Sequence, residues 1–359
     1  MSGELSRVTM AHGAGGAAMQ ELISSVILPI LSNKKWRIRG LRVPLDALDD
    51  SAVVDGTVFT TDSHTVRPIF FPGGDIGSLS VAGTVNDLAV VGARPLALSA
   101  GLVLEEGIEL GELERVVRSM ASTARLAGVP VVTGDTKVVE SGAVQKMIIN
   151  TSGVGCRHPL LDRNLAEARR HRKVRHEWLL DSNLRPGDKI ILSGTVGDHG
   201  IAVLSKREGY GFDSVVKSDV LPLNRLMEAA LRVGGVVSAK DPTRGGLANL
   251  LNEWAQKSMV GIEVYEESIP VSDGVRSACE MLGLDPLIIG NEGKVVLGVV
   301  EEMAEEVLRA LRRMREGRRA AVIGEVRRDI RPGRVVLATS VGGRRILEQP
   351  AGDPIPRIC

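Results

Sequence analysis

The hydrophobic pattern of the chain divides into two successive runs of alternating strands and helices. In the first run, stretches rich in Val, Ile and Leu indicate strands at residues 52–54, 57–61, 96–104, 129–133 and 143–154, and apolar residues at helical spacing indicate helices at 76–91 and 110–126. In the second run, the same criteria indicate strands at 189–193, 262–265, 295–300 and 320–326, and helices near 201–207, 223–233, 247–257 and 303–315. The pattern therefore predicts an α/β chain in two halves, with long antiparallel pairings in each.

Turns and changes of composition divide the chain into five segments. We expect an N-terminal Gly-rich arm with an amphipathic helix (1–37), a first domain (38–156), a basic insertion (157–183), a second domain (184–345) and a flexible tail (346–359). Between residues 157 and 175 the insertion holds seven basic residues against two acids, and it has little apolar surface to bury. We interpret it as a peripheral, solvated helical excursion, with a docking surface for an acidic partner as one alternative. A zinc site at Cys156, His158, His171 and His176 is the other, although these residues match no standard ligand spacing.

Composition excludes several classes of protein. The length of 359 residues favours two domains, and only 3% aromatic residues argue against a stacking platform for single-stranded nucleic acid. The net charge of +1 gives no overall attraction to nucleic acid or membrane, and three cysteines are too few and scattered for a disulfide framework. We find neither a signal peptide nor an apolar run long enough to span a bilayer, so we expect a cytoplasmic protein.

One hairpin concentrates negative charge. The dipeptide Asp55-Gly56 is typical of a type I′ turn between two strands. Counting back from this turn, the paired strands bring three acids to one end of the hairpin: Asp49, Asp50 and Asp62. Like charges at that distance repel unless a cation lies among them.

Two further acids have a similar setting. Asp87 lies in a helix otherwise rich in Gly, Ala and Val, and Asp135 follows a short apolar strand. Each acid taken singly could simply cap a turn or a helix. Together, the five acids favour Mg²⁺, a hard cation that carboxylates share with phosphate oxygens.

Three Gly-rich turns could supply amide donors for phosphate. They lie at residues 12–16, 72–78 and 241–247, each before a helix, and the last contains Arg244. None is a Walker A loop or a dinucleotide fingerprint, and each is compatible with ordinary turn chemistry. Many acids beside Gly-rich turns, without a Walker A loop, indicate an unusual ATP-binding fold.

The chain ends in a cysteine. Pro350, Pro354 and Pro356 disfavour helix, so the tail that carries Cys359 is expected to be extended. A terminal thiol on such a segment is either an ordinary frayed end or a group that visits a site.

Several motifs together resemble a known superfamily. They are Asp49-Asp50-Ser51-Ala52, Thr61-Asp62-Ser63-His64, Val85-Asn86-Asp87-Leu88 with Gly92-Ala93-Arg94-Pro95, and Gly134-Asp135-Thr136. This set resembles the aminoimidazole ribonucleotide synthetase (PurM-like) superfamily. His12-Gly13-Ala14-Gly15-Gly16, Asp241-Pro242-Thr243-Arg244, Asn291-Glu292-Gly293-Lys294 and the ending Pro356-Arg357-Ile358-Cys359 make the match close to the hydrogenase maturation factors of the HypE family.

The resemblance implies a fold and an activity. The fold would be a PurM-like pair of domains, each a mixed, largely antiparallel sheet covered by helices, with a homodimer formed through the N-terminal half. A HypF-type carbamoyltransferase would load a carbamoyl group onto the terminal thiol, and ATP would drive its dehydration to a thiocyanate. The cyanide would pass to the iron of a [NiFe]-hydrogenase through a HypC–HypD complex.

The resemblance, together with the chemistry described above, also predicts which residues form the site. Catalytic roles are expected for Cys359, Glu292, Lys137 and Arg244, with Glu292 as the candidate base. Nucleotide contacts are expected from His12, Gly13, Gly15, Gly16, Asp62, Asn86, Asp87, Gly134, Asp135 and Thr136. Mg²⁺ ligands are expected to be Asp49, Asp50, Asp62, Asp87 and Asp135.

Two other functions remain possible from the sequence. One is an ATP-dependent synthetase or kinase for a diffusible substrate, of the selenophosphate or aminoimidazole ribonucleotide type, which would have no use for a terminal cysteine. The other is a non-catalytic carrier that presents Cys359 and whose nucleotide site is only structural. The intact acid cluster argues against a carrier, because a site that no longer binds nucleotide would tolerate loss of those charges.

Overall fold

The N-terminal half is built on a six-stranded sheet. The structure, a computed structural model, describes residues 7–31, 38–211, 215–352, 355 and 357–359. The strands run in the order β1-β2-β3-β8-β6-β7, and every pairing except β6 with β7 is antiparallel. Their bounds are Leu41–Val43 (β1), Ala52–Val54 (β2), Thr57–His64 (β3), Ala93–Glu105 (β6), Val131–Val139 (β7) and Met147–Arg157 (β8). The predicted mixed, largely antiparallel sheet is confirmed.

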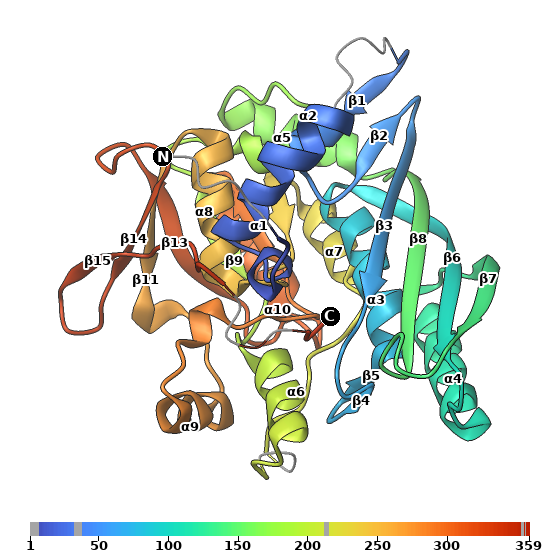
Figure 1. Ribbon diagram of the computed structural model, residues 1–359. Coiled ribbons are helices and arrows are strands. Elements are labelled where there is room, and N and C mark those ends of the chain that lie inside the picture. The colour runs from blue at the N-terminus through green and yellow to red at the C-terminus, as the bar shows by residue number, and fades with distance from the viewer. Residues whose placement is uncertain (1–6, 32–37, 212–214, 353–354, 356) are drawn as a thin grey trace.

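Helices cover only one face of this sheet. Helix α3 (Ile76–Val90) contacts β3, β8 and β6, and α4 (Leu110–Ala127) packs beside α3 (Figure 1). A short hairpin of β4 (Phe70–Phe71) and β5 (Gly74–Asp75) leads into α3. On the opposite face, Phe59 and Val154 are paired neighbours and remain 45% and 44% exposed. This open apolar face has no covering element among the described residues.

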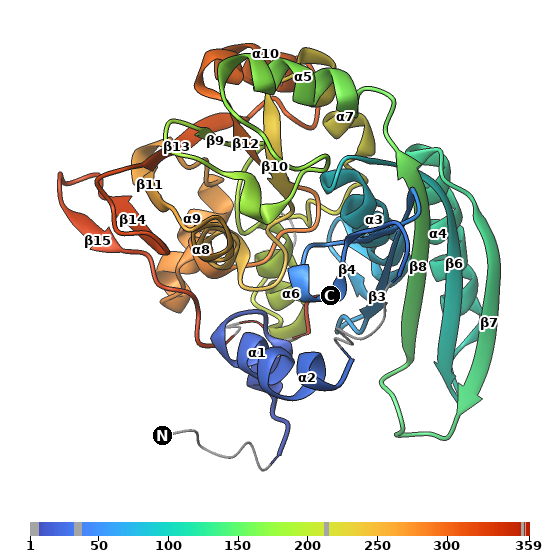
Figure 2. The ribbon, with the colours of Figure 1, turned by 90° about the horizontal axis from the view of Figure 1, so that it is seen from above.

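The C-terminal half contains a seven-stranded sheet. Its order is β10-β12-β9-β13-β11-β14-β15, antiparallel except between β11 and β14. Its strands are β9 (Lys189–Leu192), β10 (Val236–Lys240), β11 (Gly261–Tyr265), β12 (Val296–Val299), β13 (Ala321–Arg327), β14 (Arg334–Ala338) and β15 (Arg344–Ile346). Figure 2 shows helices on both sides of this sheet. One layer holds α5 (Leu161–His171), α7 (Asn224–Val233) and α10 (Ala304–Arg312), and α8 (Gly246–Ser258) covers the other face. Helices α6 (Asp198–Glu208) and α9 (Asp273–Leu282) pack against each other beyond the end of the sheet, and their buried residues join the hydrophobic cluster of the N-terminal half.

Sequence periodicity identified most of these elements but not all. Strand β10 and helix α9 were absent from the prediction, because β10 is short and buried throughout and α9 contains polar residues and a glycine. None of the helices among the described residues combines the length and apolar character needed to cross a membrane.

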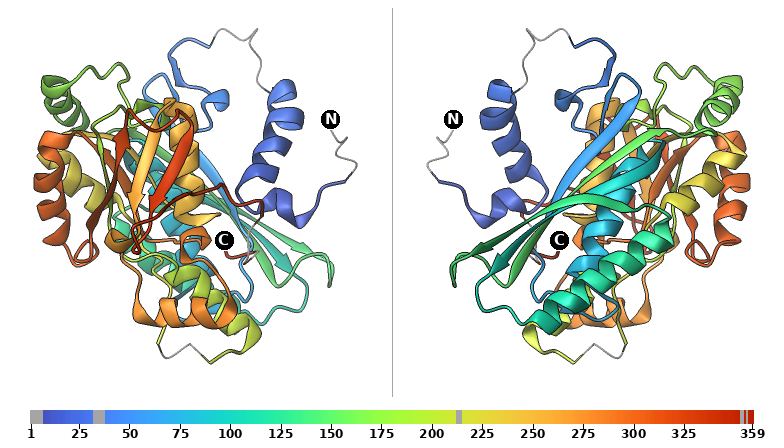
Figure 3. Two further views of the ribbon diagram at one scale, coloured as in Figure 1. Left: turned by 90° about the vertical axis from the view of Figure 1, so that its left-hand side faces the viewer. Right: turned by 90° about the vertical axis from the view of Figure 1, so that its right-hand side faces the viewer.

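The N-terminal arm forms a helical rod along the outside of the molecule. The amphipathic helix predicted within the arm is present as α1 (Ala17–Leu22), a π-helical stretch (Ile23–Ile27) and α2 (Leu28–Leu31) (Figure 3). The rod reaches the chain's other end, since the backbone N of Ala17 donates to the carbonyl of Pro350.

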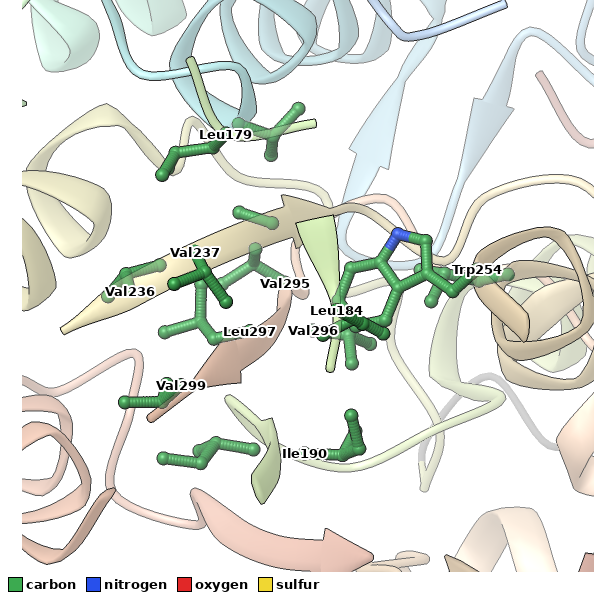
Figure 4. Packing of buried hydrophobic residues seen from close by; sticks show 14 of the residues in the cluster. Leu179, Leu184, Ile190, Val236, Val237, Trp254, Val295, Val296, Leu297 and Val299 are labelled. Carbon is green, nitrogen blue, oxygen red and sulfur yellow. The ribbon is translucent and has the colours of Figure 1, made fainter. Parts of the chain in front are cut away.

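The interpretation of 157–183 as a peripheral insertion is wrong. Leu161, Leu165 and Ala168 of α5 are fully buried, and Trp178 and Leu179 join the same core. Figure 4 shows Leu179 close to the strands of the second sheet. The basic residues occupy the solvent side of an amphipathic helix, so net charge concealed a continuous apolar face.

Candidate active site

The predicted hairpin forms and points its open end at helix α3. Val53 pairs with Val58 as expected, and the turn residues Asp55 and Gly56 have φ angles of 48° and 81°. Beyond the paired residues, Thr60 Oγ1 donates to the Asp50 carbonyl at 3.0 Å and to Asp87 Oδ2 at 2.9 Å. The hairpin end and the helix therefore present their acids to each other.

Three carboxylates lie close enough to share a cation. Oxygens of Asp50, Asp87 and Asp241 lie within 4.8 Å of one another. Burial, reinforced by neighbouring acids including Asp241, raises the pKa of Asp87 well above its ordinary value. Burial, followed by the charge of Asp50, raises the pKa of Asp241 to about 7. An all-oxygen set whose charges oppose one another fits Mg²⁺, because the ion would relieve that repulsion.

A cavity of about 190 Å³ lies between the two halves beside these acids. Its lining residues are Asp50, Thr60, Thr61, Asp62, Gly83, Asp87, Asp241, Thr243, Arg244, Glu292 and Cys359. Negative charge at Cys359, and then at Asp62 and Glu292, raises the pKa of the Arg244 guanidinium. Asp62 lies 3.1 Å from His64 Nε2. Although burial alone would raise it, the pKa of Asp62 is lowered by His64 and then Arg244.

The terminal residues are docked in this site. Figure 1 shows the C terminus between the two halves. Ile355 and Ile358 are each 1% exposed, and the Ile358 carbonyl accepts a hydrogen bond from His199 Nε2 at 2.8 Å. Thr65 Oγ1 donates to the Cys359 carbonyl at 3.3 Å. The expected extension at Pro354 and Pro356 lies outside the described residues.

Glu292 enters the cavity from the loop before β12. Its side chain is buried, and Oε1 has no hydrogen-bond partner among the described residues. Burial, and then the charges of Asp241 and Asp62, raises its pKa well above the ordinary value. Asp219 holds the backbone of this loop by accepting from the amide of Glu292 at 3.1 Å. A buried, unpartnered carboxyl facing a cavity is a suitable proton acceptor.

Other predicted residues lie next to the cavity rather than in it. Asp49 accepts from the backbone N of Asp181 at 3.0 Å, and burial followed by the charge of Asp181 raises its pKa to about 7. Gly15 and Gly16 line a second cavity of about 260 Å³, which also contacts Asp49 and Arg244. A Cβ on Gly15 would lie 2.6 Å from Cβ of Arg244, so this turn needs glycine to pack on the arginine loop.

Three of the residues predicted to contact the nucleotide lie outside the cavity that holds Cys359. His12 is half-buried and contacts Thr9 through Nδ1, and a Cβ added to Gly13 would meet no described atom within 4 Å. Asn86 is fully buried, where it accepts from the backbone N of Leu223 at 2.7 Å and so connects the two halves. These three residues do not line the cavity that holds Cys359.

The structure does not bring the β7 motif to the acid cluster. Strands β8 and β6 separate β7 from β3, and the β7 residues of the motif are exposed: Gly134, Asp135, Thr136 and Lys137. Lys137 Nζ lies 4.0 Å from Asp135 Oδ2. The expectation that one chain assembles all five acids is therefore not met, because Asp135 lies on the far edge of the sheet.

Sequence reasoning missed the residues that support the acids. Asp241 begins the motif Asp241-Pro242-Thr243-Arg244, and its position directly after a buried strand is the signal that could have identified it as a candidate metal ligand. Lys240 and Asp181, both buried, carried no signal in the sequence because their partners come from distant segments.

Comparisons with known proteins identify the same family over nearly the whole chain. The AIR synthase related protein family matches with its N-terminal domain over residues 48–156 and its C-terminal domain over 185–336. The chain is 46% identical to carbamoyl dehydratase HypE of Azotobacter vinelandii, covering 98% of this chain and 97% of that protein.

Solved structures give the same result. A chain of a HypE–HypF complex is 42% identical with a TM-score of 0.81, covering 92% of this chain and 99% of that one. The structure of HypE in complex with ATP is 44% identical with a TM-score of 0.78, and the match covers 98% of this chain and 100% of that one. The predicted PurM-like two-domain fold is confirmed.

Proposed function

The chain belongs to the HypE carbamoyl dehydratases of the AIR synthase related family, and from this we propose the chemistry of its own site. It is an ATP-dependent enzyme of hydrogenase maturation that dehydrates a carbamoyl group carried on Cys359 to a thiocyanate. The observation that carries this assignment is the docking of the terminal cysteine in a cavity with three clustered acids, Arg244 and Glu292.

The nucleotide chemistry rests on the acid cluster. Asp50, Asp87 and Asp241 would hold Mg²⁺, with Asp62 beside them. When bound, Mg²⁺ would neutralise charge on the phosphates during transfer. Arg244, half-buried and lining the same cavity as Cys359 and Asp62, is suited to orient the acceptor and balance negative charge.

Dehydration of the carbamoyl group on Cys359 takes place in two stages. The carbamoyl oxygen attacks the γ-phosphorus of ATP and the nitrogen loses one proton, which leaves ADP and an O-phosphorylated imidate on sulfur. The C–O bond then breaks, phosphate leaves, and the nitrogen loses its second proton as the C≡N bond forms. Glu292, whose buried Oε1 has no hydrogen-bond partner within the described part of the chain, accepts a proton from nitrogen.

Two features of the chain suggest its partners: the tail that carries Cys359 and the open face of the N-terminal sheet. A HypF-type carbamoyltransferase is the donor, supported by the relative solved with HypF, and a HypC–HypD complex is the acceptor of cyanide. A second copy of the chain would cover the open face of the N-terminal sheet, where Phe59 and Val154 are exposed. Asp135 and Lys137, exposed on β7, would then be available to the neighbouring copy's nucleotide site.

Mass spectrometry of the C-terminal peptide tests the assignment. After incubation with HypF-type transferase, carbamoyl phosphate and ATP, Cys359 should gain a carbamoyl group and then lose one water. The Cys359→Ala variant should show neither species, and a Cys156→Ala variant should behave as wild type. Modification on Cys156 or Cys279, or in Cys359→Ala, would contradict it. A diffusible substrate is disfavoured because the chain's own terminus occupies the cavity.

A further inference from the structure

Asp181 lies buried at the end of the segment that joins the two halves. It begins the 3-10 turn Asp181–Asn183 and is 1% exposed. Its carboxylate accepts hydrogen bonds from Lys257 Nζ at 2.7 Å, Lys240 Nζ at 3.1 Å and Trp254 Nε1 at 2.7 Å. Three donors therefore hold this carboxylate in one orientation.

Lys240 connects Asp181 to the acid cluster. Its Nζ also donates to Asp50 Oδ1 at 2.9 Å and lies 3.4 Å from Glu253 Oε2. One oxygen of Asp50 is thus fixed by a lysine whose own position depends on Asp181. The backbone N of Asp181 donates to Asp49 as well, so Asp181 contacts both acids at the hairpin end either directly or through one lysine.

The charges predict the consequence of losing Asp181. Lys240 and Lys257 both contact it, and the removal of one negative charge would leave excess positive charge beside Asp50. A cation at Asp50, Asp87 and Asp241 would then meet greater repulsion. In addition, Lys240 would lose the contact that fixes its direction, and the Asp50 carboxylate would lose its orientation.

We propose that Asp181 is a positioning residue for the metal site, acting through Lys240 on the carboxylate of Asp50. This inference rests on the metal site of the proposed function. It assigns the segment between the family's two domains a part in ATP chemistry, although that segment does not line the cavity that holds Cys359.

Binding of Mn²⁺, monitored by electron paramagnetic resonance on the full chain, tests the proposal. Asp181→Asn should raise the Kd for Mn²⁺ about tenfold or more, as loss of an outer partner does in metal sites. Asp188→Asn is the matched control, because Asp188 is equally buried and accepts from Arg172 Nε at 2.8 Å, away from the acid cluster. It should leave the Kd within about twofold.

A milder variant keeps the test valid if Asp181→Asn does not fold. Trp254→Phe removes one donor to Asp181 while preserving an aromatic ring, and should raise the Kd about two- to fivefold. An unchanged Kd in Asp181→Asn, or in Trp254→Phe where only that variant folds, overturns the inference. So does equal weakening in Asp188→Asn.

One further variant separates this inference from the proposed site. Asp87→Asn should abolish Mn²⁺ binding at this position. If Asp87→Asn binds Mn²⁺ as wild type does, the metal site itself is wrong and the inference fails with it. If Asp87→Asn loses binding while Asp181→Asn keeps it, only the role of Asp181 is wrong.

Discussion

At the scale of single residues, burial decides which groups can react. Glu292 and Cys279 are both nearly inaccessible, yet they differ in surroundings. Glu292 faces a cavity with other acids, whereas Cys279 lies on the buried side of helix α9 and belongs to an apolar core. One is suited to proton transfer and the other to packing.

Replacing Glu292 by Gln should separate loading from dehydration. The amide keeps the size of the side chain but cannot accept a proton, so dehydration should slow by about 10²- to 10⁴-fold. Carbamoylation of Cys359 should persist, and the carbamoylated peptide should accumulate in mass spectra. Glu306→Gln, on the exposed side of α10, is the control and should dehydrate normally. Equal dehydration rates in the two variants would rule out Glu292 as the base.

The buried thiol of Cys279 should react slowly at neutral pH. Burial, followed by the charges of Asp285 and Glu280, raises the pKa of Cys279 to about 11, so its reactive thiolate is scarce below that pH. At pH 8 the thiolate fraction is on the order of one in a thousand, and it should rise about tenfold per pH unit towards pH 11. Iodoacetamide labelling at pH 8 should therefore modify the partly exposed Cys156 far faster than Cys279. Peptide mass spectrometry between pH 7 and 11 measures both rates, and equal labelling at pH 8 would contradict the expectation.

At the scale of elements, the segment between the halves behaves as core. Helix α5 contributes buried residues on one side, and a 3-10 turn then delivers Asp181 to the interior. Shortening this segment would remove buried apolar side chains such as Leu165 and the buried carboxylate of Asp181, so it would disturb both packing and charge.

Truncating Leu165 should therefore destabilise the protein. Leu165→Ala removes a fully buried side chain and should lower the free energy of unfolding by about 2–5 kcal/mol. Arg163→Ala, on the exposed side of the same helix, should change it by about 0.5 kcal/mol or less. Urea denaturation of both variants measures the difference. Similar midpoints for the two variants would restore the peripheral interpretation.

The hairpin shows what the sequence can predict and where it cannot. The Asp55-Gly56 turn and strict alternation determine its register, so the meeting of Asp50 and Asp62 at one end followed from local rules. Asp135 was misplaced because it lies beyond two intervening strands, whose order no local pattern reveals. The contacts of Lys240 with Asp50 and Asp181 join residues far apart in sequence, and only the packed structure identifies them.

At the scale of the whole molecule, one face of the N-terminal sheet remains available for assembly. Phe59 and Val154 form an apolar pair on that face, opposite the α3 layer. Exposed apolar area on a flat sheet is typical of a protein–protein interface. A homodimer through this face would bury it.

Charge on the open face should prevent dimerisation. Phe59→Lys should shift the protein from dimer to monomer in sedimentation velocity, because the lysine would be buried without a partner. Met281→Lys is the control, since Met281 is 73% exposed on α9 in the other half. It should leave the dimer intact. A dimeric Phe59→Lys variant, or a monomeric wild type, would exclude this interface.

The docked terminus also has a kinetic consequence. A substrate group attached to the enzyme's own chain is held at a local concentration set by the tether, on the order of millimolar for a short flexible link. Dehydration is then a first-order reaction, so its rate per molecule does not depend on the protein concentration. The rate of this step also shows no saturation as the concentration of carbamoyl donor rises. In the proposed cycle each chain carries one substrate group at a time, so turnover is limited by encounters with the partners that load and unload Cys359.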